Sequence, residues 1–167
     1  MKTVRSACQL QPKALEINVG DQIEQLDQII NDTNGQEYFK KTFITDGFKT
    51  LLSKGMARLA GKSNDTVFHL KQAMGGGKTH LMVGFGLLAK DAALRNSHLG
   101  SMPYQSDFGS AKIAAFNGRN NPHSYFWGEI ARQLGREGVF REYWESGAKA
   151  PDEQAWINIF DGEEPIL

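Results

Sequence analysis

Three consecutive glycines followed by Lys-Thr constrain the fold of this chain more than any other feature. Residues 72–79 read Gln-Ala-Met-Gly-Gly-Gly-Lys-Thr. Gly77, Lys78 and Thr79 match the second half of the phosphate-binding pattern G-x-x-x-x-G-K-[ST], whereas Gln72 stands where that pattern has its first glycine. Only a loop with little side-chain bulk lets backbone N–H groups converge on phosphate oxygens. The alternative is a glycine-rich turn that happens to precede Lys-Thr.

The segments on either side of the glycines favour the phosphate-binding interpretation. Residues 66–70 read Thr-Val-Phe-His-Leu, which is typical of a β-strand. Residues 78–90 are apolar almost all round, which predicts a helix buried on more than one side. Gly84 and Gly86 would weaken that helix unless they allow close contact with a sheet. A strand, a glycine loop and a buried helix in this order predict a P-loop.

The loop residues predict a site for ATP and Mg²⁺. Lys78 would bridge the β- and γ-phosphates, and Thr79 would place its hydroxyl on Mg²⁺. The N-terminus of the helix would add free N–H groups and a positive dipole end. The predicted cofactor-binding residues are Met74, Gly75, Gly76, Gly77, Lys78, Thr79 and His80.

The rest of the chain completes an α/β order. Helices are predicted at about 21–34, 46–60, 122–134 and 151–161, strands at 66–71 and 111–116 and from 165 onward, and a polar loop at 96–110. The apolar stripe of helix 46–60 packs against the domain that follows or, alternatively, forms a groove for a partner. We therefore expect a helical segment over residues 1–61 and an incomplete P-loop nucleotide-binding core over residues 62–167, ending before the Walker B strand. The predicted fold class is α/β, a partial P-loop NTPase core of the AAA/ASCE type with an N-terminal helical segment.

An ATPase also needs an acid that holds the Mg²⁺-bound water. The candidate is Asp161, although the proline and acids at 151–153 predict that it ends a helix. We expect the acid to lie beyond Leu167 instead. Arg119 follows a predicted strand and is either a phosphate contact or a surface arginine. The four histidines show no metal-ligand spacing.

Composition and charge limit the partners and the cellular location that we expect. Nineteen basic and nineteen acidic residues give zero net charge, which argues against a general attraction to nucleic acid or anionic membrane. The single cysteine, Cys8, excludes an intrachain disulfide. The N-terminus lacks the apolar region of a signal peptide, and no apolar stretch is long enough to cross a bilayer. We expect a cytoplasmic location.

The chain resembles the start of bacterial ATP-binding proteins of the domain-of-unknown-function 499 (DUF499) family. The resemblance lies in residues 1–8, 43–47, 72–80, 84–90, 117–119, 126–131, 150–151 and Trp156. Gln72 in place of the first glycine is shared with that family. The resemblance implies an AAA-like ATPase associated with phage-defence and modification gene clusters, in a longer chain whose next strand carries an acidic pair.

Three functions follow as expectations. The first is the ATP-binding part of a cytoplasmic ATPase, without turnover in this piece alone. The second is a non-catalytic nucleotide-binding or assembly module, and the third is a small-molecule P-loop kinase. A kinase is disfavoured because no arginine-rich lid is visible. Candidate partners are DNA, defence-system proteins and further copies of the chain.

Overall fold

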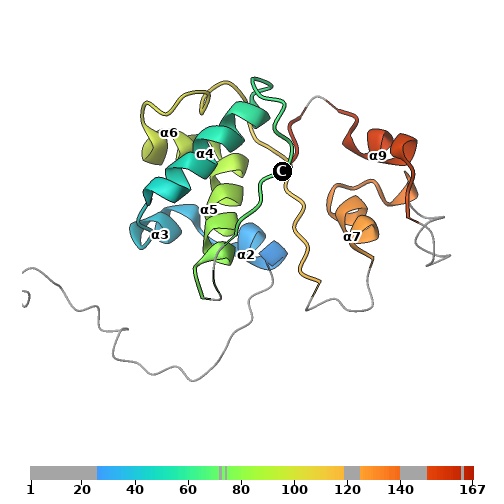
Figure 1. The fold of residues 1–167 in the computed structure, drawn as a ribbon, viewed down its shortest axis with the longest axis horizontal. Coiled ribbons are helices and arrows are strands. Elements are labelled where there is room, and N and C mark those ends of the chain that lie inside the picture. Colours follow the sequence, from blue (N-terminus) through green and yellow to red (C-terminus); the bar gives the residue numbers. More distant parts are fainter. Residues whose placement is uncertain (1–25, 72, 74, 119–124, 140–149, 163) are drawn as a thin grey trace, which may run out of the picture.

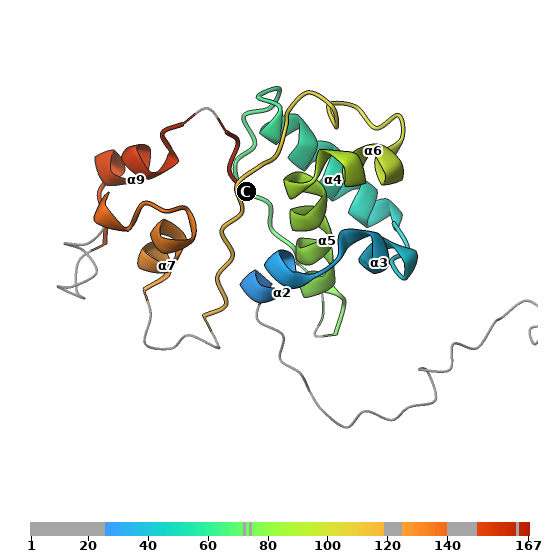
Figure 2. The ribbon, with the colours of Figure 1, turned by 180° about the vertical axis from the view of Figure 1, so that it is seen from behind.

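The computed structural model describes residues 26–71, 73, 75–118, 125–139, 150–162 and 164–167. Helices dominate this part of the chain, and they fall into two groups (Figure 1). The N-terminal group consists of α2 (Leu26–Asp32), α3 (Gly35–Lys40), α4 (Asp46–Leu59), α5 (Lys78–Lys90) and α6 (Ala92–Leu99). The C-terminal group consists of α7 (Phe126–Gln133) and α9 (Glu153–Phe160). Figure 2 shows the same separation from behind.

Helix α5 forms the centre of the N-terminal group. It packs against α2, α3, α4 and α6, and residues 83–89 are all buried. Glycines let the neighbouring helices approach, because a Cβ on Gly84 would lie 2.8 Å from the Phe48 ring and one on Gly86 would lie 3.0 Å from Ile30. The sequence predicted a buried helix correctly. The covering elements around these two glycines are helices and not the expected sheet.

Short-range capping explains where several helices begin. Thr45 accepts the N–H of Phe48 at the start of α4, one residue before the expected cap Asp46. Asp91 accepts the N–H groups of Ala93 and Leu94 and so starts α6. The predicted polar loop therefore begins only after Leu99. The apolar stripe expected on α4 is confirmed as core, since these residues are buried: Phe48, Leu51, Leu52, Met56 and Leu59.

Arg95 organises the loop that follows α6. Its side chain is fully buried and lies with its guanidinium 4.0 Å from the centre of the Phe108 ring. It donates to the carbonyls of Leu88 and Ala89 (both 2.9 Å), Gln105 (2.8 Å), Phe108 (2.7 Å) and Gly109. Burial lowers the pKa of Arg95, and the nearby Asp91 charge partly offsets this. The Arg95 guanidinium thus bonds to carbonyls of the last turn of α5 and to carbonyls of residues 105–109, and so holds the two segments together.

The expected α/β sheet is not formed by the described residues, so the predicted fold class is wrong. Residues 66–71 form neither helix nor strand and make no backbone hydrogen bond to another described segment. The second predicted strand forms one isolated parallel bridge, Lys112 to Ile166, in which Lys112 donates to Pro165 (2.9 Å) and Leu167 donates to Lys112 (2.9 Å). Strand propensity makes a segment extended, but a sheet also needs neighbours to accept its hydrogen bonds. Within the described residues, helices occupy the space around α5 instead.

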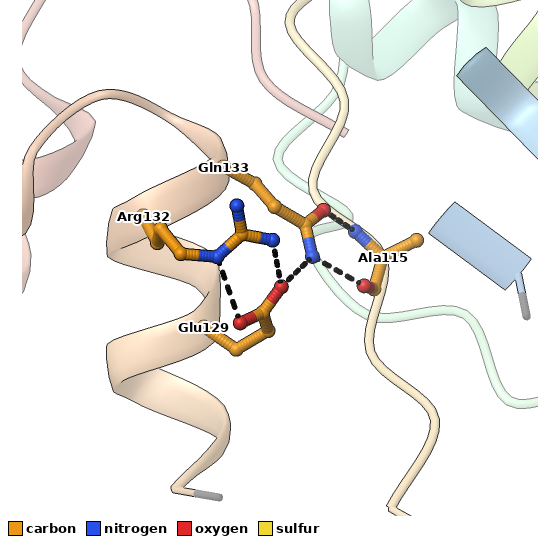
Figure 3. Close-up of polar contacts among 4 residues, drawn as sticks. All are labelled: Ala115, Glu129, Arg132 and Gln133. Carbon is orange, nitrogen blue, oxygen red and sulfur yellow. Dashed lines mark hydrogen bonds and ion pairs between the residues drawn. The ribbon is translucent and has the colours of Figure 1, made fainter. Parts of the chain in front are cut away.

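Along residues 111–115, the side chain of Gln133 makes hydrogen bonds to the backbone that a neighbouring strand would make in a sheet. Figure 3 shows the amide of Gln133 on α7 paired with the backbone of Ala115 in both directions: Ala115 N–H donates to Gln133 Oε1, and Gln133 Nε2 donates to the Ala115 carbonyl, both at 2.8 Å. Glu129 holds this amide by accepting from Gln133 at 2.8 Å and is itself paired with Arg132. The amide therefore ties the C-terminal group to the extended segment. The small core of this group consists of Ala131, Leu134, Ala155 and Ile159.

Candidate phosphate-binding loop

The glycine loop ends directly on the N-terminus of α5. Gly75 has φ 78° and Gly77 has φ 77° and ψ 19°, a left-handed conformation that disfavours residues with a side chain. Nothing lies within 4 Å of a Cβ built on either glycine, so backbone conformation and not space demands glycine here. Gly76 N–H donates to the Ala73 carbonyl at 3.1 Å and tightens the turn.

Gly77 is the N-cap of α5, and no side chain caps this helix. The first turn of α5 also carries no acidic side chain. The other helix starts of the N-terminal group with a side-chain cap use Asn34, Thr45 and Asp91. At the N-terminus of α5, the residue at the cap position therefore has no side chain that could accept from the backbone N–H groups. The positive end of the helix dipole lies at the same place.

Lys78 reaches back across the loop. Its Nζ donates to the Ala73 carbonyl at 3.1 Å, and the side chain is half-buried. The ammonium group of Lys78 and the N–H of Gly76 thus share the Ala73 carbonyl as their acceptor. A cation beside several backbone N–H groups is suited to an anion with several oxygens.

Thr79 is exposed and lines an open groove of about 700 Å³ together with Lys71 and Lys78. The side chains lining this groove include these two lysines and no acid. The hydroxyl of Thr79 could serve as one ligand of a Mg²⁺ ion that arrives with a phosphate. No group of three or more His, Cys, Asp or Glu side chains in the described part of the chain could hold a metal by itself. The described groove residues offer one hydroxyl ligand, so a Mg²⁺ ion here would take its other oxygen ligands from a bound phosphate and from water.

The His80 side chain contacts α3 and Thr42, which follows that helix. Its ring stacks on Tyr38 with centroids 4.8 Å apart, and its Nε2 lies 3.2 Å from the Thr42 hydroxyl oxygen. Tyr38 also donates from its hydroxyl to the His80 carbonyl at 2.6 Å. Tyr38 and Thr42 thus fix the first turn of α5, a role that nothing in the sequence pattern indicated. The contribution of His80 to a ligand at the loop would come from its backbone.

The other predicted site residues are not brought to the loop. Asp161 is the C-cap of α9, where its carbonyl accepts from Arg136 at 2.8 Å. It lines a different cavity, with Lys112 and Glu164, and is not among the residues lining the groove of Thr79. Met74 and Arg119 lie outside the described residues.

Among the described residues, fold and site together define a helical protein with a glycine-rich loop at the start of its central helix. The family model of the DUF499 N-terminal domain matches residues 9–99, which is more than half of the chain and includes α2–α6 and the loop. The chain belongs to the DUF499 family. Comparisons with curated proteins and with solved structures gave no match. In the described residues, no helix combines the length and the apolar character that crossing a membrane requires.

Proposed function

We propose that this chain binds ATP with Mg²⁺ through the glycine loop and the first turn of α5. The residues in this role are Met74, Gly75, Gly76, Gly77, Lys78 and Thr79, with the backbone of His80. The observation that carries the proposal is a Gly-Gly-Gly-Lys-Thr sequence placed directly at the uncapped N-terminus of a thirteen-residue helix. The N–H groups there would donate to phosphate oxygens.

Each side chain has a distinct task in this proposal. Lys78 exchanges its bond to the Ala73 carbonyl for a charge-assisted bond to phosphate, which is stronger. Thr79 orients the Mg²⁺ that accompanies the nucleotide, and Mg²⁺ neutralises phosphate charge when it is bound. Tyr38 and Thr42 hold His80, and so keep the first turn of α5 in position for the ligand.

The proposal for this chain is binding and not turnover. Hydrolysis also needs a carboxylate that positions the attacking water or its metal. No acidic side chain lines the groove of Thr79, and Asp161 lies in another cavity. The same lining is expected of a non-catalytic nucleotide-binding module, the second candidate, and of the ATP-binding part of an ATPase whose acid lies elsewhere. An AAA-like ATPase activity would require an acid from outside the described residues.

Titration with a fluorescent ATP analogue in the presence of Mg²⁺ tests the proposal. Lys78→Ala should weaken binding by at least about 30-fold, which corresponds to a lost charge-assisted bond of roughly 2 kcal/mol. Lys90→Ala is the matched control, since Lys90 is an exposed lysine in the last turn of the same helix. Equal affinity in the parent and Lys78→Ala proteins would refute the loop as the binding site.

A further inference from the structure

The side chain of Tyr38 on α3 lies against the first two turns of α5. Its hydroxyl donates to the His80 carbonyl at 2.6 Å, across 42 positions of the sequence. Its ring stacks on the His80 ring and lies beside Gly84, where an added Cβ would come within 3.3 Å of Tyr38 Cε1. Glycine at position 84 therefore leaves room for the ring, and the ring directs the hydroxyl to one carbonyl of α5.

Thr42 fixes the orientation of the His80 ring. The Thr42 hydroxyl donates its one proton to the Tyr38 carbonyl at 2.8 Å, so it acts as the acceptor toward His80 Nε2, which lies 3.2 Å away. This arrangement places a proton on Nε2 of His80. Tyr38 and Thr42 thus hold His80 at two points, the carbonyl of its main chain and Nε2 of its ring.

The His80 carbonyl is one link in a chain of hydrogen bonds that ends in the glycine loop. It belongs to the same peptide group as the N–H of Leu81, which donates to the Gly77 carbonyl at 3.0 Å. The Gly77 carbonyl in turn shares a peptide group with the N–H of Lys78, in the first turn of α5. The chain therefore runs from the Tyr38 hydroxyl through two peptide groups to an N–H at the junction of loop and helix.

Hydrogen bonds in series polarise one another. A donor to the carbonyl of a peptide group makes the N–H of that group a stronger donor, by an amount on the order of 10–30% per bond. The Tyr38 hydroxyl acts in this way on the N–H of Leu81 and, through the Gly77 carbonyl, on the N–H of Lys78. The direction favours an anion, because each link draws electron density away from the N–H groups at the start of the helix.

We propose that the Tyr38 hydroxyl, beyond holding the first turn of α5, strengthens the Lys78 N–H as a donor to phosphate. This role rests on the proposed binding of ATP and Mg²⁺ at the loop, and it adds a positioning residue from a different helix. Tyr38 itself touches neither phosphate nor metal. Because coupling between two bonds is reciprocal, a bound nucleotide also strengthens the bond between Tyr38 and His80, and so links α3 to the occupancy of the loop.

Tyr38→Phe tests this role, because it removes the hydroxyl and keeps the ring that stacks on His80. Mg²⁺ and a fluorescent ATP analogue are titrated into the parent, Tyr38→Phe and Tyr104→Phe proteins, at a temperature where urea unfolding shows all three to be folded. Tyr104 is the matched control, an exposed tyrosine in the loop after α6. We expect Tyr38→Phe to bind at least about threefold more weakly, from the loss of one hydrogen bond in the chain, and Tyr104→Phe to bind like the parent.

A second readout separates polarisation from a general loosening of the fold. Amide-proton chemical shifts are measured by NMR in the parent and in Tyr38→Phe, without nucleotide. A weaker hydrogen bond moves an amide proton upfield, so the proton of Leu81 should move upfield and that of Lys78 should follow by a smaller amount. A loss of packing alone would shift the amides of α3 and of the first turn of α5 without this order.

The outcomes of these experiments are distinct. Weaker binding by Tyr38→Phe together with the ordered upfield shifts supports the role of the hydroxyl. Equal binding by Tyr38→Phe and the parent overturns it and leaves the proposed nucleotide site intact. Weaker binding without the ordered shifts also overturns it, because Tyr38 would then act through packing. No saturable binding by the parent refutes the nucleotide site itself, and the role of Tyr38 with it.

Discussion

The two helical groups differ in how completely they bury their large side chains. The large side chains with less than 2% exposure are Phe48, Leu52, Met56, Val83, Leu88, Leu94, Arg95 and Ile159, and within the described residues only the last belongs to the C-terminal group. In that group Phe126 and Phe160 are 46% and 48% exposed. Their rings stack instead on Trp156, at 6.0 and 5.5 Å. Complete burial needs neighbours on several sides: α5 is packed by α2, α3, α4 and α6, whereas no comparable packing surrounds α7 and α9 in the part of the chain that the structure describes. We therefore expect the N-terminal group to be the more stable of the two.

The largest expected effect comes from removing the buried cation of the N-terminal group. Arg95→Met removes a donor from five backbone carbonyls, of which that of Ala89 keeps the N–H of Ala111, and we expect a loss of about 4 kcal/mol in the free energy of unfolding by urea. Arg58→Met is the control, because Arg58 is exposed and bonds to one carbonyl, that of Ser63. Similar losses in the two variants would show that Arg95 does not organise this region.

A smaller loss should follow from overpacking the contact between α4 and α5. A Cβ on Gly55 would lie 2.1 Å from the Phe85 ring, so Gly55→Ala should destabilise the protein by about 2 kcal/mol. Gly47→Ala lies in the first turn of the same helix, and its nearest neighbour there is 4.0 Å away. That control should be neutral or stabilising by up to about 1 kcal/mol. A thermal melt in which both variants shift alike would disprove the close packing.

The link between the two groups can be tested at Gln133. Gln133→Met keeps the length of the side chain but leaves both backbone groups of Ala115 unpaired, so we expect a loss of about 1.5 kcal/mol. All three tryptophans follow residue 126, so their fluorescence reports on the C-terminal part of the chain. The unfolding midpoint seen by tryptophan fluorescence should fall. The midpoint seen by circular dichroism, to which the N-terminal helices contribute most, should change less. The exposed Gln154→Met is the control, and an identical shift in both signals would mean that the groups unfold as one unit.

The smallest effect is a pH dependence confined to the C-terminal group. Hydrogen bonding from Arg132 lowers the pKa of Glu129, which burial opposes and a hydrogen bond from Gln133 supports. A carboxyl whose pKa is lowered by folding stabilises the fold above its unfolded pKa of about 4.5, and this contribution is lost as pH falls through the folded value. Because Arg132 is 48% exposed, we expect less than about 1 kcal/mol. In Glu129→Gln, the change in tryptophan fluorescence on acidification should then be smaller than in the parent protein. An equal change in both proteins would mean that other groups cause the acid transition.

Local signals in the sequence predicted the helices better than they predicted the sheet. The ends of α4 and α5 follow from nearby residues, because capping and helical periodicity act within a few positions. Thr66–Leu70 has the composition of a strand, but pairing depends on distant segments that composition does not reveal. The contacts of Tyr38 with His80 join positions 42 residues apart and could not be predicted for the same reason. Nothing in the sequence pattern singled out Arg95, since its five carbonyl partners come together only in the folded chain.

The most direct test of the central claim is to map the ligand on the loop by NMR. A ¹⁵N-labelled protein is titrated with Mg²⁺ and a non-hydrolysable ATP analogue, and backbone amide shifts are followed. Our account predicts that the largest shifts occur at Gly75, Gly76, Gly77, Lys78 and Thr79, because these backbone amides form the loop and the helix start where the phosphates would bind. Saturable shifts centred elsewhere, or none at millimolar nucleotide, would contradict it.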